Sequence, residues 1–236
     1  MDAKKINDCI MNFIKNGKPN IPLSINERSL QVFGDEKFLA SGECKKFLNK
    51  HGISMGIFNV YKTPEPFIYF KYSDEPKTAL IIENKDTWYT MRKLLLKGNK
   101  ICGVTIDVLI YGEGRKIQNS FQYMEVEDTN EIHGVETFYY FGDIDSSGID
   151  IMYKLIKEYS GYHIVPFVPG YEYLYEKREY GRVKDLKLAV SITYKELALL
   201  KFLGDKALDD IYTLCNHNYI IPQELLNYNV LTEKAS

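Results

Sequence analysis

Three acidic residues occupy positions at which enzymes of the α/β class often place chemistry. Glu83 follows a strand-length apolar run at residues 79–82, and Asp143 and Asp145 follow a second such run at residues 137–141. After the acids, each stretch passes through small or polar residues into a helical pattern. Parallel strands joined by crossover helices end at the same edge of a sheet, where open α/β folds bind their ligands. We therefore expect the three carboxylates to converge.

Carboxylates held close together repel one another unless they take up protons or share a cation. Oxygen ligands suit Mg²⁺ or Mn²⁺, which can hold phosphate oxygens at the same time. The sequence thus predicts a divalent-metal site that acts on a phosphate ester. Asp145 has an alternative role, because a carboxylate at a strand end can cap the next helix.

Two neighbouring charged residues have two interpretations each. Lys85 is placed either to contact a phosphate or to be a solvated lysine beside the acids. Asp150, one turn into the helix that follows Asp145, is either a further metal ligand or part of a solvated helix face. Glu224, near the end of the chain, could also reach the acids.

Composition limits the class of protein. A chain of 236 residues with 45% hydrophobic content can form one large core, or a core domain with a smaller attachment. No apolar run approaches the ~20 residues that a membrane span needs, and the four cysteines contain no Cys-x-x-Cys pair. We expect a reduced, cytoplasmic protein with no membrane partner. The formal net charge of −2 gives no general electrostatic case for nucleic acid, which leaves only local patches.

The pattern of expected elements changes near residue 75. Residues 1–75 are expected to form a small α+β element with helices at 4–16 and 42–50 and strands at 30–33, 55–61 and 67–72. Residues 76–236 alternate strand and helix, which is typical of an α/β domain with a parallel four-stranded sheet flanked by helices. The four strands are expected at residues 79–82, 104–111, 137–141 and 164–168. A capping box at Thr193 and Glu196 begins a helical C-terminal tail.

The order of the acids resembles a known domain. Glutamate at the end of one strand, followed two strands later by Asp-x-Asp-x-x-Gly, resembles the Toprim domain of topoisomerases, primases and related nucleases. The amino-acid sequence of residues 142–151 is similar to that of the topoisomerase VI A-subunit branch. It is more similar still to that of the JetD family, the nuclease subunits of Wadjet anti-plasmid systems. Further stretches resemble the same family: Asn26-Glu27-Arg28-Ser29-Leu30, Phe33-Gly34-Asp35-Glu36-Lys37, Pro64-Glu65-Pro66-Phe67, Glu83-Asn84-Lys85-Asp86-Thr87 and Pro222-Gln223-Glu224.

This resemblance, over roughly residues 26–224, implies a Toprim site that cuts double-stranded DNA for a complex built around a condensin-like SMC motor. Asp143 and Asp145 would hold Mg²⁺, and Glu83 would complete the metal shell or accept the proton of the attacking water. No tyrosine matches the nucleophile of the topoisomerase branch, so hydrolysis is favoured over covalent transesterification. Paired cuts would favour a homodimer with two sites, by symmetry.

The chain also departs from its relatives, which carry a longer N-terminal arm and a winged-helix-like domain before Toprim. Here only about 75 residues precede the strand of Glu83, so we expect DNA engagement to differ or to need a partner. Two other functions stay open: a non-catalytic Toprim scaffold that binds DNA ends or a partner, and a small phosphohydrolase with a nucleophilic aspartate. The basic stretches at residues 92–100 and 177–187, with Arg115 and Lys116, would form a phosphate track if they line the acidic edge.

Overall fold

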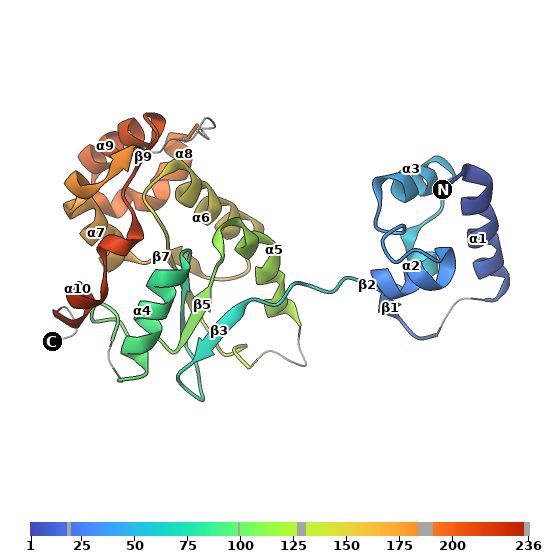
Figure 1. The fold of residues 1–236 in the computed structure, drawn as a ribbon, viewed down its shortest axis with the longest axis horizontal. Coiled ribbons are helices and arrows are strands. Elements are labelled where there is room, and N and C mark those ends of the chain that lie inside the picture. Colours follow the sequence, from blue (N-terminus) through green and yellow to red (C-terminus); the bar gives the residue numbers. More distant parts are fainter. Residues whose placement is uncertain (18–19, 99, 127–130, 184–190, 234–236) are drawn as a thin grey trace. The chain divides into compact units, whose positions relative to one another are not determined.

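The computed structural model describes residues 1–17, 20–98, 100–126, 131–183 and 191–233, which belong to two compact units (Figure 1). The first unit spans Met1–Pro64 and the second spans Glu65–Ser236. Among the described residues, no helix combines the length and the apolar character that a membrane crossing requires.

The first unit is a small helical module with its own apolar core. Asp2 caps its first helix and a capping box of Ser24 and Glu27 begins its second, which Gly34 ends in the left-handed conformation. The core includes Ile10, Phe58 and other buried apolar side chains. Its elements are α1 (Ala3–Lys15), β1 (Leu23–Ser24), α2 (Ile25–Phe33), α3 (Gly42–Lys50), the 3₁₀ helix η1 (Met55–Phe58) and β2 (Val60–Tyr61).

Two expected strands in this unit are wrong. Residues 30–33 end helix α2, in which Ser29 and Phe33 are buried at a spacing of four while Leu30 is exposed, so the burial is helical rather than alternating. Residues 55–61 form η1 followed by the two-residue strand β2, because Ser54 caps a 3₁₀ turn through the N–H of Gly56.

The second unit is built on a five-stranded mixed sheet with the strand order β3-β5-β4-β6-β7. Four strands are parallel, and the edge strand β3 pairs with β5 in the antiparallel direction. Residues 79–82 of the central strand β4 are fully buried, as a sheet covered on both faces requires. The strands are β3 (Ile68–Lys71), β4 (Thr78–Ile82), β5 (Val108–Tyr111), β6 (Thr137–Phe141) and β7 (Ile164–Pro166).

The expected four-stranded, all-parallel sheet is therefore corrected to a five-stranded mixed one. The difference is β3, which we had assigned to the small N-terminal element of residues 1–75. Its backbone pairs with β5 instead, and the division between the compact units falls at Pro64 and Glu65. The expected strand at 104–111 begins only at Val108, because Val104 forms an isolated bridge with Ile101.

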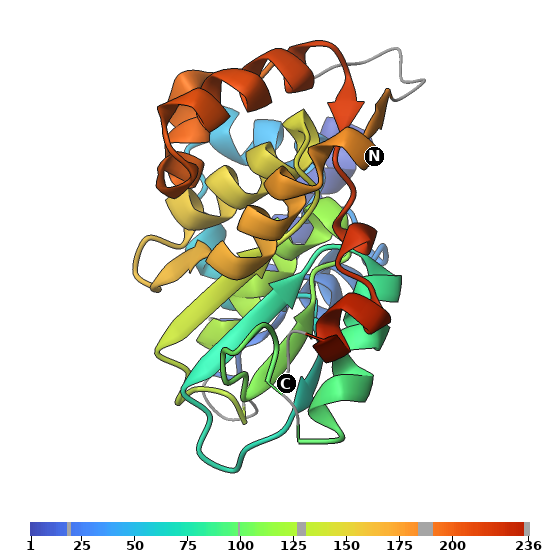
Figure 2. The same cartoon turned by 90° about the vertical axis from the view of Figure 1, so that its left-hand side faces the viewer.

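Helices cover both faces of the sheet. In Figure 2, α4 (green) and α10 (dark red) lie on one side of the strands, and α6 (olive) lies on the other. The helical elements after β4 are α4 (Lys85–Leu95), η2 (Gly114–Lys116), α5 (Ile117–Ser120), η3 (Phe121–Glu125), α6 (Ser146–Glu158), α7 (Val168–Glu176), η4 (Arg178–Tyr180), α8 (Tyr194–Leu197), η5 (Ala198–Leu203), α9 (Asp205–Asn216), η6 (Gln223–Leu225) and α10 (Tyr228–Glu233). Thr193 and Glu196 form the predicted capping box at α8.

The C-terminal segment returns to the end of β6. The short strands β8 (Arg182–Val183) and β9 (Tyr219–Ile220) pair with each other. Immediately after β9, Ile221 exchanges two backbone hydrogen bonds with Ile144, at 3.0 and 3.1 Å. Residues far apart in the sequence are thus brought to the edge that carries Asp143 and Asp145.

Candidate functional site

Glu83 and Asp143 flank the point at which the sheet changes its direction of winding. From β4 the chain crosses through α4 to β5 on one side, whereas β6, on the other side of β4, leads through α6 to β7. At such a switch point the loops after the two strands leave toward opposite faces, and open α/β folds bind their ligands at the carboxyl ends of these strands. The N–H of Glu83 donates to the carbonyl oxygen of Phe141 at 3.0 Å, so the acids begin where the paired strands end.

A buried tyrosine holds the carboxylate of Glu83. The hydroxyl of Tyr140 donates to Glu83 Oε2 at 3.2 Å. Burial raises the pKa of Tyr140 well above its ordinary value, and the negative charge of Glu83 raises it further. Tyr140 is therefore a protonated hydrogen-bond donor at any physiological pH.

Two glycines leave the space that Glu83 occupies. A Cβ atom at Gly142 would collide with Glu83 Oε2, and one at Gly148 would collide with the carbonyl oxygen of Asp143 and lie 3.1 Å from Glu83 Oε2. Neither glycine has positive φ, so the backbone conformation does not require glycine here. Glycine is needed because a Cβ atom would come too close to neighbouring atoms. Steric crowding thus explains why the last residue of the Asp-x-Asp-x-x-Gly motif, Gly148, is a glycine.

Asp143 is held from two distant parts of the chain. Its Oδ1 accepts from the backbone N–H of Gln223 at 2.8 Å and from Asn84 Nδ2 at 3.3 Å. The same Asn84 nitrogen donates to Glu224 Oε1 at 2.9 Å, which brings a fourth carboxylate to this edge. Asp143 is 8% exposed, so these donors replace most of its contact with water.

Asp145 fills the capping role that the sequence left open. It is the N-cap of α6, and its Oδ1 accepts from the N–H of Gly148 at 2.7 Å. Asp145 nevertheless lies close enough to Glu83 and Asp143 for all three charges to affect the pKa of the same residue, Tyr171. Burial raises the pKa of the Tyr171 hydroxyl well above its ordinary value, the N–H of Gly142 opposes that rise, and the charges of Glu83, Asp143 and Asp145 add to it.

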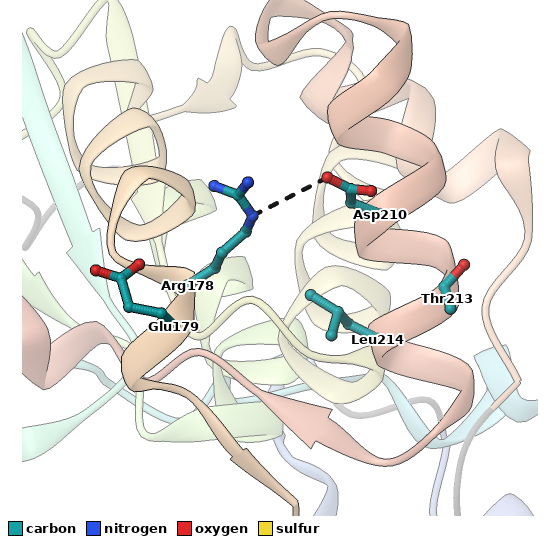
Figure 3. A pocket seen from close by; sticks show the side chains of 5 residues that line it. All are labelled: Arg178, Glu179, Asp210, Thr213 and Leu214. Atoms are coloured by element: carbon teal, nitrogen blue, oxygen red, sulfur yellow. Dashed lines mark ion pairs between the residues drawn. The ribbon is translucent and has the colours of Figure 1, made fainter.

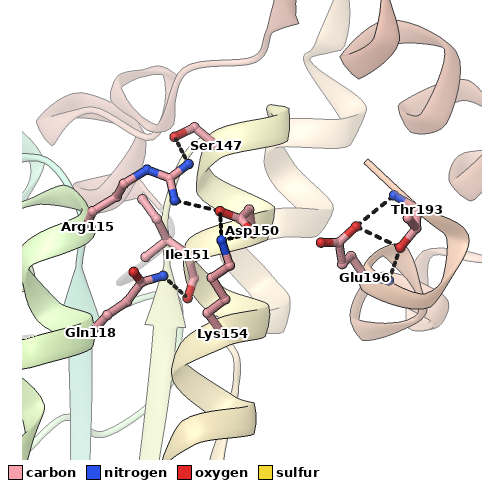
Figure 4. A network of polar contacts seen from close by, with 8 residues as sticks. All are labelled: Arg115, Gln118, Ser147, Asp150, Ile151, Lys154, Thr193 and Glu196. Atoms are coloured by element: carbon pink, nitrogen blue, oxygen red, sulfur yellow. Dashed lines mark hydrogen bonds and ion pairs between the residues drawn. The ribbon is translucent and has the colours of Figure 1, made fainter. Parts of the chain in front are cut away.

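Asp150 lies apart from these neutral donors, in a cluster of cations (Figure 4). Its side chain is 4% exposed, and Arg115 Nη1 lies 2.6 Å from Oδ2. Lys154 Nζ lies 2.9 Å from each carboxylate oxygen, and Arg115 also donates to Ser147 Oγ at 3.3 Å. Burial alone would raise the pKa of Asp150, but the hydrogen bonds and charges of Lys154 and Arg115 lower it below its ordinary value. The structure thus places Asp150 on a buried ion pair rather than on the solvated face that was one of its two interpretations.

A family model for the C-terminal part of the Wadjet protein JetD matches residues 50–235. The chain belongs to this family. Membership of the JetD family implies a role in Wadjet anti-plasmid defence and a complex with other Wadjet subunits. No curated protein is significantly similar to the chain.

The JetD-family match includes the whole sheet, Glu83, the Asp143–Asp150 stretch and Glu224. It begins at residue 50, so α1, α2 and α3 lie wholly or almost wholly outside it.

The basic residues divide between the two edges of the sheet. Lys85 is the first residue of α4 and is exposed beside the acids, and Arg115 lies just after β5 at the same edge. The stretch at 92–100 is at the far end of α4, where Arg92 packs over the ring of Phe70 and Lys97 donates to Tyr228. That stretch cannot extend a phosphate track from the acids. Residues 184–187 of the other basic stretch lie outside the described residues.

One cavity of about 490 Å³ lies between η4 and α9 (Figure 3). Its described lining residues are Arg178, Glu179, Asp210, Thr213 and Leu214. Arg178 lies 4.0 Å from Asp210, which also accepts from the hydroxyl of Tyr175 at 2.7 Å. The acids of the JetD-like motif are not among these residues, so the cavity is separate from the candidate site.

The donor set fits a hard divalent cation that keeps part of its hydration shell. Among the described residues, no group of three or more His, Cys, Asp or Glu side chains is arranged as a complete metal site. Mg²⁺, however, usually binds through one or two carboxylates, several waters and substrate phosphates. Glu83 in its glycine cradle and Asp143 at the end of the neighbouring strand meet that requirement.

Several groups at the site were not predicted. Asn84 and Gln223 entered the sequence analysis only within family-like stretches, and Tyr140 and Tyr171 are ordinary strand and helix residues in the sequence. Gln223 is fully buried, yet neither Nε2 nor Oε1 of its side chain has a hydrogen-bond partner among the described residues. Its backbone N–H, which no side-chain pattern reveals, makes the contact with Asp143.

Proposed function

We propose that this JetD-family protein is a divalent-metal-dependent DNA endonuclease with a Toprim-type site. The observation that carries the proposal is the meeting of Glu83 and Asp143 at the carboxyl ends of adjacent parallel strands, on either side of the switch point. The glycine cradle supports it, because Gly142 and Gly148 keep open the space around the Glu83 carboxylate. Asp145 and Lys85 are the other residues we assign to the site.

The residues have distinct roles in this proposal. Asp143, fixed by Asn84 and the N–H of Gln223, and Glu83, fixed by Tyr140, would hold Mg²⁺ or Mn²⁺. When bound, the cation supplies charge neutralisation at the phosphate oxygens and lowers the pKa of a coordinated water. In the alternative arrangement, Glu83 would leave the cation to Asp143 and would accept the proton of the attacking water.

Positive side chains beside the acids would position the DNA backbone. Lys85 is exposed at the N-terminus of α4, and the side chain of Arg115 is 45% exposed while its guanidinium is oriented by Asp150. Contacts of this type fix the register of the duplex and carry no sequence information. We therefore expect cutting with little sequence preference.

The wider setting is inferred from the family. Double-stranded DNA is the proposed substrate, condensin-like SMC subunits of the Wadjet complex are the proposed partners, and the cytoplasm is the proposed compartment. A homodimer with two sites would make paired cuts.

Incubation of supercoiled plasmid with the purified protein and Mn²⁺ or Mg²⁺ tests the activity. Wild type should nick or linearise the plasmid, and Glu83→Ala and Asp143→Ala should each lower the rate by about 100-fold or more. Asp74→Ala is the control, because Asp74 is exposed in the loop before β4, at the opposite edge of the sheet. Cutting that survives both Glu83→Ala and Asp143→Ala would exclude the assignment.

One observation favours the alternative of a non-catalytic Toprim scaffold. Asp145 spends one carboxylate oxygen on the α6 cap, and the described residues contain no complete three-ligand group. A scaffold would shift DNA in a gel but leave the plasmid intact even when the other Wadjet subunits and ATP are added. Release of phosphate from small monoesters would instead indicate a phosphohydrolase.

A further inference from the structure

The C-terminal segment that returns to β6 places the side chain of Glu224 beside Asn84, at the edge of the sheet that carries the acids. Ile221 is tied to Ile144 by two backbone hydrogen bonds, and the next residues form η6 (Gln223–Leu225). Gln223 donates its N–H to Asp143 Oδ1 at 2.8 Å, which fixes the start of η6 against the acid. Glu224 follows directly and is exposed.

The amide of Asn84 joins the carboxylates of Asp143 and Glu224. A single nitrogen, Nδ2, lies 3.3 Å from Asp143 Oδ1 and 2.9 Å from Glu224 Oε1. Two like charges around one neutral amide repel each other, and the amide adds no positive charge to offset them. A surface glutamate could avoid this by turning into water, yet Glu224 points to the amide that already serves Asp143.

From this arrangement we infer that Glu224 is a further cation-binding acid of the site and that Asn84 is the positioning residue that holds it beside Asp143. This inference rests on the proposed metal-dependent function and deepens it. The cation would be bound by acids from both β-strand loops and from a segment 140 residues away from Asn84 in the sequence.

If so, the affinity for the cation depends on the charge of Glu224 and not only on its hydrogen bond with Asn84. Glu224→Gln keeps an oxygen that can accept from Asn84 but removes the charge, whereas Glu224→Ala removes both. Asn84→Ala keeps the acid but removes the amide that orients it. Groups that orient metal ligands typically change metal affinity by about 10- to 100-fold when they are replaced.

The test is titration of the purified full chain with Mn²⁺ alone, followed by electron paramagnetic resonance and calorimetry, without DNA. Relative to wild type, Glu224→Gln should weaken Mn²⁺ binding by about tenfold, and Glu224→Ala and Asn84→Ala by about as much or more. The resonance of bound Mn²⁺ should change in Asn84→Ala. Glu233→Gln, an exposed glutamate in α10, should bind as wild type does.

The outcomes separate the two proposals. If Asp143→Asn loses Mn²⁺ binding while Glu224→Gln binds as tightly as wild type, Glu224 is a surface residue and only this inference fails. If wild type itself binds no Mn²⁺, the metal-dependent function fails together with it. Thermal melting of each variant, expected within a few degrees of wild type, confirms that a loss of binding is not a loss of fold.

Discussion

Asp150 differs from Asp143, which lies seven residues before it in the sequence, and from Glu83 in the donors that hold its carboxylate. Asp150 is held by Arg115 and Lys154, two cations. Asp143 is held by the amide of Asn84 and a backbone N–H, and Glu83 by the hydroxyl of Tyr140, all neutral groups. The first set of bonds cancels the negative charge of its acid, whereas the second orients its acids without adding positive charge.

We propose that this difference separates a structural acid from acids able to bind a cation. A buried carboxylate is costly unless it is hydrogen-bonded and compensated, and Asp150 obtains both from its own chain. The hydrogen bonds from Tyr140, Asn84 and the N–H of Gln223 orient Glu83 and Asp143 without adding a positive charge, which a divalent cation bound there would add. We therefore place Asp150 outside the proposed metal shell, although the sequence suggested it as a ligand.

Closing the glycine cradle should produce the largest effect. In Gly142→Ala the new methyl group would occupy the place of Glu83 Oε2, and that flexible carboxylate has to move. Misplacement of a catalytic group by about 1 Å can cost about 100-fold in rate. We expect Mn²⁺-dependent plasmid cleavage to fall by about that factor while far-ultraviolet circular dichroism stays unchanged.

A matched control for this change is Gly161→Ala, because a Cβ at Gly161 meets no atom within 4 Å. Gly161→Ala should cleave at the wild-type rate. Equal rates for Gly142→Ala and wild type would show that the position of Glu83 does not limit the reaction.

Replacement of Asp150 should change stability and leave metal binding intact. Asp150→Asn removes the charge that pairs with Arg115 and Lys154, both partly exposed, and we expect a loss of about 1–2 kcal/mol in the free energy of unfolding. Urea unfolding at neutral pH measures this loss, and Mn²⁺ titration should give the wild-type affinity. A large loss of Mn²⁺ affinity with unchanged stability would return Asp150 to the metal shell.

The ion pairs of Asp150 with Arg115 and Lys154 also predict that the stability of the protein depends on pH. The pKa of Asp150 is lower in the folded protein than its ordinary value of about 3.9, so the ionised form is favoured by folding. The stabilisation is fully present above the ordinary value and is lost as the pH falls through the folded pKa. The difference in stability between wild type and Asp150→Asn should therefore be constant at neutral pH and shrink below about pH 4. A difference that grows toward low pH would contradict the assignment.

The sequence predicted the elements whose signals are local. Strands β4 and β6 are apolar runs that end in acids, and the capping box of Thr193 and Glu196 follows from a short-range pattern. The edge strand β3 was assigned to the wrong part of the chain, because its pairing with β5 is a long-range contact that no local pattern records. Residues 30–33 illustrate the converse. These four mostly apolar residues suggest a strand, but in the structure they are the end of the helix that begins at the Ser24 cap.

The same limit applies to the candidate site. The positions of Glu83 and Asp143 at one edge follow from the βαβ pattern, but the donors that hold them come from across the chain. Asn84 connects to a residue in η6, and Asp143 accepts from a backbone N–H near the C-terminus. Backbone donors have no sequence signature, so the difference between Asp150 and Asp143 became visible only in the structure.

The smallest effect should come from the side chain of Gln223, and it tests whether backbone or side chain serves Asp143. Within the described part of the chain, the side-chain amide of Gln223 is fully buried and has no hydrogen-bond partner, and a buried unsatisfied polar group costs about 1–3 kcal/mol. Gln223→Met has a similar volume and keeps the N–H that donates to Asp143. We expect urea unfolding to show a gain of about 1 kcal/mol and Mn²⁺ titration to show no change. A loss of Mn²⁺ affinity would mean that the amide itself takes part in the site, through a water or the cation, and that neutral side-chain donors do more there than orient the acids.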